Sequence, residues 1–233
     1  MAPETEARYV PATRWRAFTR LYDPILASAM REGRWRWEML RRLESELPER
    51  ATVVDVGCGT GTFALALKER RADVQVVGVD GDEEILGLAR AKPGASQIEW
   101  RKGLAQEAPV KSGSADAVTI SLVLHHLLPE DKRRALAEAR RIVKPGGRLH
   151  VADWGRPSDP LMSGLFFVAQ AIDGFDRTAD HRAGRLPTFV AEAGFDPVES
   201  YGRFRTGFGL VELLRAEPQP STTTGRARSV RRW

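Results

Sequence analysis

Two acidic residues frame a glycine-rich turn in the first half of the chain. Asp55 stands two residues before Gly57, Gly59 and Gly61, and Asp80 follows the apolar run 76–79, nineteen positions after Gly61. Glycines let the backbone approach a ligand closely, and the amides that open a following helix face the ligand's polar groups. A carboxylate after the second strand accepts hydrogen bonds from both hydroxyls of a ribose. The pattern predicts a ligand site.

The charge of Asp55 separates two ligand classes. In the dinucleotide fingerprint the last small residue would fall at Thr62, and Gly61 comes one position early. A carboxylate just before the turn opposes a pyrophosphate, but it suits an ammonium group such as the methionyl end of S-adenosylmethionine. The sequence therefore favours S-adenosylmethionine, with a nicotinamide dinucleotide as the alternative.

His125 and His126 are the candidate catalytic residues. They follow the strand predicted at 117–121, and an imidazole serves as a general base near neutral pH. The alternative is that one packs at the sheet edge while the other lines the cofactor pocket without moving a proton. Further pocket candidates are Asp153, Trp154 and His181.

Alternating strands and helices must position these residues. Residues 53–56, 74–79, 98–101, 117–121 and 149–152 predict strands, with helices at 62–67, 83–91 and 131–143 between them, and a helix at 187–193 and strands at 197–201 and 207–214 after them. Such alternation is typical of an α/β protein with a doubly wound parallel sheet. Lys144, Pro145, Gly146 and Gly147 predict a sharp stop before the strand at 149–152.

The chain divides into three parts by its local patterns. Residues 1–50 show helical periodicity and predict an N-terminal helical cap, residues 51–217 predict the ligand-binding domain, and residues 218–233 predict a disordered basic tail. The apolar stretch 161–175 predicts either a lid over the site or core packing.

Charge and cysteine content limit the partners. The net charge of +5 arises largely from four arginines in the tail, and the segment from Arg8 to Arg42 carries nine arginines against three acidic residues. That segment predicts peripheral membrane contact, with a solvated helix face as the alternative. We expect no nucleic-acid partner, no membrane span and a cytoplasmic location. A single cysteine, Cys58, and four scattered histidines predict no metal site and no cysteine nucleophile.

Five segments in order resemble the class I S-adenosylmethionine-dependent methyltransferases. Asp55 with its glycine turn is similar to the first motif of that family, and Asp80 to its ribose-binding acid. The other matching segments are Ser114-Ala115-Asp116-Ala117-Val118, Leu122-Val123-Leu124-His125-His126-Leu127 and Lys144-Pro145-Gly146-Gly147. Within the family the chain looks most like the ubiquinone/menaquinone biosynthesis type.

The resemblance implies a Rossmann-like, doubly wound, seven-stranded and mostly parallel sheet with N-terminal helices. It implies methyl transfer from S-adenosylmethionine to a small-molecule acceptor, with positioning as the main catalytic effect. An NAD(P)-dependent oxidoreductase, an RNA or protein methyltransferase and a non-catalytic binding domain are the alternatives. Where related enzymes often carry an acid beside the adenine, this chain has Gly103-Leu104-Ala105, so Gln106 or backbone groups must serve. The cofactor-binding residues it implies are Tyr22, Asp55, Gly57, Gly59, Gly61, Asp80, Gly81, Leu104, Ala105 and Ser121.

Overall fold

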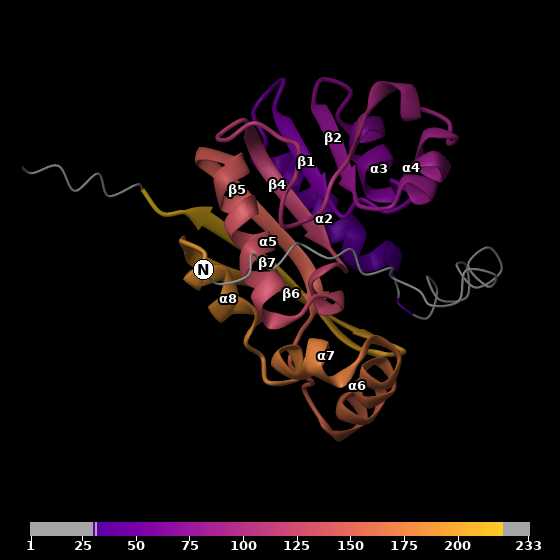
Figure 1. The fold of residues 1–233 in the computed structure, drawn as a ribbon, viewed down its shortest axis with the longest axis vertical. Coiled ribbons are helices and arrows are strands. Elements are labelled where there is room, and N and C mark those ends of the chain that lie inside the picture. Colours follow the sequence, from indigo (N-terminus) through magenta and orange to yellow (C-terminus); the bar gives the residue numbers. More distant parts are fainter. Residues whose placement is uncertain (1–29, 31, 221–233) are drawn as a thin grey trace, which may run out of the picture.

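A single seven-stranded sheet organises the protein. The computed structural model describes residue 30 and residues 32–220. The strands are β1 (Thr52–Val56), β2 (Gln75–Asp80), β3 (Glu99–Lys102), β4 (Ala115–Ser121), β5 (Val143–Trp154), β6 (Phe195–Thr206) and β7 (Gly209–Pro218). They lie in the order β3-β2-β1-β4-β5-β7-β6, and β7 alone runs in the direction opposite to all the others. The predicted mostly parallel, Rossmann-like sheet is confirmed (Figure 1).

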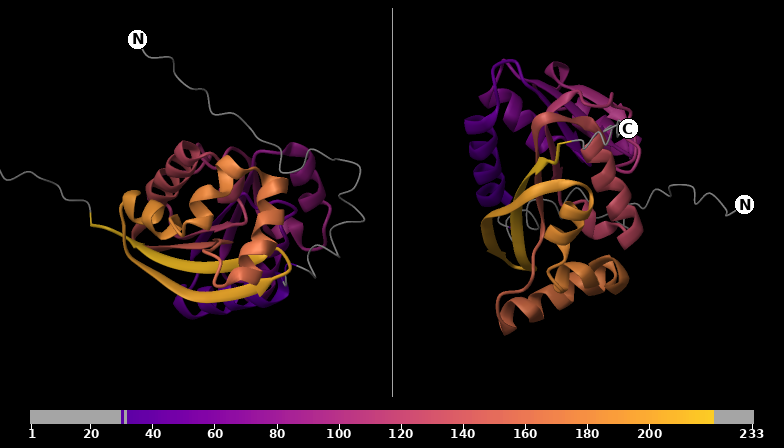
Figure 2. Two further views of the ribbon diagram at one scale, coloured as in Figure 1. Left: turned by 90° about the horizontal axis from the view of Figure 1, so that it is seen from below. Right: turned by 90° about the vertical axis from the view of Figure 1, so that its left-hand side faces the viewer.

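Helices cover both faces of this sheet (Figure 2). They are α2 (Glu32–Glu46), α3 (Thr62–Arg70), α4 (Glu83–Arg90), α5 (Pro129–Ile142), α6 (Pro160–Asp173), α7 (Phe175–Arg182) and α8 (Leu186–Glu192). Because side chains alternate along a strand, neighbouring valines of β1 enter different cores. Val53 packs with residues of α2 and α3, and Val54 packs with residues of α5 and α8.

Helices α6 and α7 lie together at the end of the molecule away from α3 and α4 (Figure 1). Phe166 of α6 is fully buried in the core that α2 and α3 share, whereas Phe167 and Phe175 are about half exposed. The stretch 161–175 therefore contributes to the core and also presents an apolar outer surface. Lys132 of α5 ties α7 in place, because its buried ammonium donates to both carboxylate oxygens of Asp180 at 2.6 and 2.8 Å.

The predicted stop at residues 144–147 lies inside β5. Val143 already pairs with Ala115, and the register shifts before Ala117 pairs with Arg148. Proline and glycine are tolerated where a ladder is interrupted, so this run forms an irregularity within the strand. The helices predicted before residue 30 and the tail beyond residue 220 lie outside the described residues.

Candidate functional site

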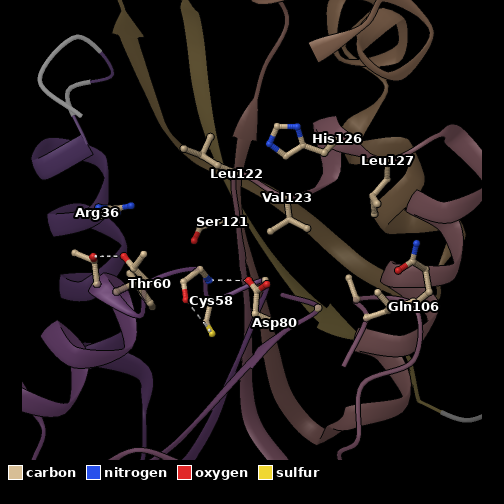
Figure 3. A pocket seen from close by; sticks show the side chains of 17 residues that line it. Arg36, Cys58, Thr60, Asp80, Gln106, Ser121, Leu122, Val123, His126 and Leu127 are labelled. Carbon is tan, nitrogen blue, oxygen red and sulfur yellow. Dashed lines mark hydrogen bonds between the residues drawn. The ribbon is translucent and has the colours of Figure 1, made fainter. Parts of the chain in front are cut away.

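A cavity of about 270 Å³ opens where β1, β2 and β4 end (Figure 3). These strands are parallel, so the residues at their carboxyl ends meet at one edge of the sheet. Arg36 and Gln106 lie on opposite sides of the cavity in this view, with Asp80 between them. The sequence-predicted residues that line it are Gly57, Gly59, Asp80, Gly81, Leu104, Ala105, Ser121 and His126.

The glycine turn has a shape that side chains would prevent. Gly57 and Gly61 adopt φ values of 69° and 73°, in the left-handed region that favours glycine. A Cβ on Gly57 would lie 2.3 Å from Val123 Cγ2, and one on Gly61 would lie 2.3 Å from Trp100 Cη2. The sequence therefore folds into a backbone cradle at the floor of the cavity, with Gly61 just behind its surface.

Asp80 connects the glycine turn after β1 to the backbone after β2. Its Oδ2 accepts the backbone N–H of Gly59 at 2.8 Å, and its Oδ1 accepts that of Asp82 at 3.0 Å. A carboxylate oxygen can accept more than one hydrogen bond, so Asp80, which lines the cavity, can also accept from a ligand there. Burial raises the pKa of Asp80 above its usual range. The carboxylate thus fixes the turn and also presents acceptors to the cavity.

Asp55 lies beneath the cavity rather than in its lining. Thr119 donates its hydroxyl to Asp55 Oδ1 at 2.7 Å, while Oδ2 is buried without a hydrogen bond. Burial raises the pKa of Asp55 to about 7, and this rise is opposed by the Thr119 hydrogen bond and by the positive charge of Arg36. An unpaired buried carboxylate oxygen costs free energy, so this side of the cavity favours a ligand that donates protons or carries positive charge.

Arg36 is a site residue that the sequence analysis missed. It extends from α2 into the cavity and pairs with Glu32 at 2.6 Å, and its buried Nε has no hydrogen-bond partner. In the sequence it was one of nine arginines in a basic helical segment, and nothing in the spacing set it apart. Its guanidinium gives the cavity a positive group close to the Asp55 carboxylate.

The wall formed after β3 is lined by Leu104, Ala105 and Gln106. Gly103 before them has no room for a side chain, because its Cβ would lie 2.3 Å from Pro109 Cδ. No carboxylate stands here, as the sequence analysis noted. The Gln106 amide is the polar side chain of this wall.

The two histidines have different surroundings. His126 lines the cavity, and burial together with neighbouring His125 holds its pKa well below the usual value. His125 is buried behind it, with Nδ1 2.7 Å from Asp153 Oδ1. Burial alone would lower the pKa of His125, but Asp153 outweighs that effect and raises it. The pair therefore combines a neutral imidazole at the cavity with a more basic one behind it.

The remaining predicted residues have mixed outcomes. Trp154 and His181 pack around His125, with ring centroids 5.8 and 6.4 Å from its own. Asp173 at the end of α6, which the sequence analysis did not single out, faces both histidines at 3.9 and 3.7 Å. Tyr22, expected to close over the cofactor, lies outside the described residues.

Comparison with known proteins decides the family. Residues 54–151 match the family described as "Methyltransferase domain". The chain is 32% identical over 203 residues to a demethylmenaquinone methyltransferase of Lactiplantibacillus plantarum, covering 76% of this chain and 85% of that protein. The chain belongs to the class I S-adenosylmethionine-dependent methyltransferases. The methyl donor of this methyltransferase is accordingly S-adenosylmethionine.

Other methyltransferases are similar to the chain over comparable lengths. It is 33% identical to the ubiquinone/menaquinone biosynthesis C-methyltransferase UbiE of a Caulobacter species, over 76% of this chain and 71% of that one. It is 36% identical to the demethylmenaquinone methyltransferase of Deinococcus radiodurans, of which it spans only 59%, over 63% of its own length.

Solved structures show the same fold. A methyltransferase of calicheamicin biosynthesis, with S-adenosylhomocysteine bound, superposes with a TM-score of 0.62 at 23% identity, over 80% of this chain and 55% of that one. Human N-acetylserotonin methyltransferase in complex with S-adenosylmethionine gives 0.58 at 18% identity, over 73% and 48%. Among the residues that the structure describes, no helix of the methyltransferase is both long and apolar enough to cross a bilayer.

Proposed function

We propose that this methyltransferase methylates a small aromatic acceptor that carries a hydroxyl group, of the quinol type. Two relatives whose length it covers by more than two thirds are named for menaquinone or ubiquinone biosynthesis. Beside His126 the cavity is lined by Leu122, Val123 and Leu127, which suit an aromatic ring. RNA and protein acceptors have no comparable support.

The single observation that carries the cofactor assignment is that two buried polar atoms without hydrogen-bond partners lie beside the glycine turn. Asp55 Oδ2 and Arg36 Nε are both buried without partners at one side of the cavity. An amino acid carries an ammonium and a carboxylate on adjacent atoms, and these two charges match Asp55 and Arg36. We assign the methionyl end of the cofactor to this side, with Asp55 acting directly or through water.

The rest of the cofactor follows from the geometry of the floor and the opposite wall. The Asp80 carboxylate suits the two ribose hydroxyls, and Gly81 lies beside it. The wall of Leu104, Ala105 and Gln106 suits the adenine ring. Gly57, Gly59 and Ser121 also line the cavity, and we expect the Ser121 carbonyl to accept a hydrogen bond from the methionyl amine.

S-adenosylmethionine supplies an electrophilic methyl group on a sulfonium sulfur, so the protein mainly aligns the acceptor and excludes water. Of the two histidines proposed for catalysis, His126 lines the cavity directly. His125 is held behind it by Asp153. The low pKa of His126 keeps its imidazole neutral, and a neutral imidazole can accept a proton.

The experiment has two parts. Calorimetry should show binding of S-adenosylhomocysteine and none of NADH, and labelled S-adenosylmethionine should then give turnover with quinols or phenols ahead of amines and thiols. Arg36→Ala should weaken S-adenosylhomocysteine binding about tenfold, the worth of one charged hydrogen bond. Arg41→Ala is the matched control, since Arg41 is on the same helix but exposed and paired with Glu38. NADH binding, or equal affinity in both variants, would refute the assignment.

Three expectations stay predictions. They are the closure of Tyr22 over the cofactor, membrane contact through the segment from Arg8 to Arg42, and a cytoplasmic location. Most of that segment lies outside the described residues, and its described arginines include Arg36 in the cavity and Arg41 in an ion pair.

A further inference from the structure

A polar cluster adjoins the cofactor cavity on the side of the acceptor. It consists of His125 and His126, of Asp153 and Trp154 at the end of β5, and of Asp173 at the end of α6. His126 belongs both to this cluster and to the lining of the cavity. A group bound in the cluster would therefore lie next to the methyl donor.

Asp153 holds His125 in one orientation. The Asp153 carboxylate is fully buried and accepts the backbone N–H groups of Leu124 at 2.8 Å and Trp154 at 2.7 Å, in addition to its contact with His125 Nδ1. These bonds fix the imidazole and place a proton on Nδ1. The raised pKa of His125 favours its protonated form, in which Nε2 also carries a proton and donates away from Asp153.

Asp173 faces one imidazole nitrogen of His125 and one of His126 without a hydrogen bond to either. Its oxygens lie 3.9 Å from His125 Nε2 and 3.7 Å from His126 Nδ1, beyond hydrogen-bonding distance. The indole N–H of Trp154 is buried and makes no well-formed hydrogen bond, and its polar interaction with the Asp173 carboxylate lowers the pKa of Asp173. Donors and acceptors thus face one another across a gap of 3.7 to 3.9 Å, which is too long for a direct hydrogen bond.

The chemistry of the gap selects its occupant. The N–H groups of His125 and Trp154 are donors, and Asp173 and neutral His126 are acceptors. A hydroxyl group both accepts and donates hydrogen bonds, so it satisfies both sets. A metal ion fits less well, although ligand atoms of His125, His126 and Asp173 lie within 4.8 Å of one another, because a protonated imidazole and an indole N–H repel a cation.

We propose that this cluster binds the hydroxyl group of the aromatic acceptor and takes its proton. The inference rests on the proposed function and names the residues that recognise its substrate. The acceptor O–H bond breaks, the proton passes to the carboxylate of Asp173, and the negative charge moves to the acceptor oxygen. There the N–H groups of His125 and Trp154 stabilise it, as preorganised donors stabilise other oxyanions. The phenolate is a stronger nucleophile than the neutral phenol.

Burial prepares Asp173 for this role. It raises the pKa of Asp173 above the ordinary value of an aspartate, against the opposing effect of His125, which makes the carboxylate a better proton acceptor. A phenol has a pKa near that of tyrosine, about 10, so a carboxylate can deprotonate it when its anion is stabilised by donors. An aliphatic alcohol is far less acidic. The cluster therefore favours phenols and hydroquinones.

The test compares 1-naphthol with its methyl ether, 1-methoxynaphthalene, by calorimetry on protein saturated with S-adenosylhomocysteine. The ether keeps the ring but has no proton to donate. The wild type should bind the naphthol at least about tenfold more tightly than the ether. Asp173→Ala should bring the two affinities to within about threefold, and Trp154→Phe should lower the ratio by about fivefold, because each removes one partner of the oxygen.

Asp176→Ala is the matched control, since Asp176 is three residues from Asp173 but exposed. It should keep the naphthol preference of the wild type. Melting temperatures check that each variant is folded, and Trp154→Phe retains an aromatic ring, so it remains informative if Asp173→Ala is unstable.

Three outcomes would overturn the proposal. The first is equal binding of naphthol and ether by the wild type, and the second is a preference that survives both Asp173→Ala and Trp154→Phe. The third is stoichiometric binding of Zn²⁺ that both His126→Ala and Asp173→Ala abolish, which would make the cluster a metal centre. A failure to bind S-adenosylhomocysteine would instead refute the proposed function, so the two failures are distinguishable.

Discussion

Replacement of Asp80 by alanine is the sharpest perturbation of the cofactor site. In the structure the Asp80 carboxylate accepts backbone N–H groups of Gly59 and Asp82, and we propose that it also accepts hydrogen bonds from the two ribose hydroxyls. Hydrogen bonds to a charged group contribute about 1.5–3 kcal/mol each, so losing both should cost roughly 3 kcal/mol or more. That corresponds to a loss of at least about a hundredfold in affinity for S-adenosylhomocysteine.

The stability of the free protein should change much less. Removing a carboxylate whose pKa burial has raised also removes its desolvation cost, which offsets the loss of the bonds to the Gly59 and Asp82 amides. We expect a change in unfolding free energy of about 1 kcal/mol, measured by urea titration, against the large change in affinity measured by calorimetry.

Asp82→Ala provides the control. Asp82 caps α4 by accepting the backbone N–H groups of Glu84 and Ile85, so its removal should cost about 1 kcal/mol of stability. Its backbone amide still reaches Asp80, and affinity should stay within about threefold of the wild type. An Asp80→Ala protein that binds S-adenosylhomocysteine nearly as well as Asp82→Ala does would refute the reasoning.

Three further predictions concern other parts of the site and its support. Gly57→Ala should weaken S-adenosylhomocysteine binding at least about tenfold and should lower the melting temperature more than Gly146→Ala does. Both glycines have positive φ, so either substitution costs about 1–2 kcal/mol in the backbone. Of the two, only Gly57 also lacks room for a Cβ. Burial raises the pKa of Asp55 to about 7, above its unfolded value near 4, so its ionisation lowers stability progressively from about pH 4 to pH 7. The melting temperature of Asp55→Asn minus that of the wild type should therefore increase across that interval and stay constant above it. A difference that is the same at every pH would show that the pKa of Asp55 is not shifted by folding. Lys132→Ala should cost about 3–5 kcal/mol in urea unfolding because it leaves the Asp180 carboxylate buried and unpaired, and the double variant with Asp180→Asn should recover part of that loss.

The sheet and the cofactor floor were predictable because their signals are local in the sequence. β-branched runs between turns gave the strands, and the spacing of Asp55, the glycines and Asp80 follows from strands that end at one edge. The glycine turn is easy to recognise in the sequence because Gly57 and Gly61 have positive φ and a Cβ at either position would clash with a neighbouring side chain.

The two ends of the site were not predictable in the same way. Arg36 comes from a helix that precedes the sheet, and Asp173 from a helix that follows it, and each reaches the site only through tertiary packing. Helical periodicity identifies the face of a helix that is buried, but it does not identify which polar residue at the border of that face enters a cavity. Asp153, Trp154 and His181 were candidates from the sequence, but their arrangement around His125 came from the structure.

The matched family segment, residues 54–151, contains the glycine cradle and the carboxylates at the floor of the cavity, while Arg36 precedes this segment and Asp173 follows it. Substitutions in α2 or α6 can therefore change one end of the site while the glycine turn and the carboxylates of the matched segment stay the same. Because the proposed contact of Asp173 with the acceptor lies at the end of α6, we expect that exchanging the α6 region between relatives changes the acceptor that each one prefers.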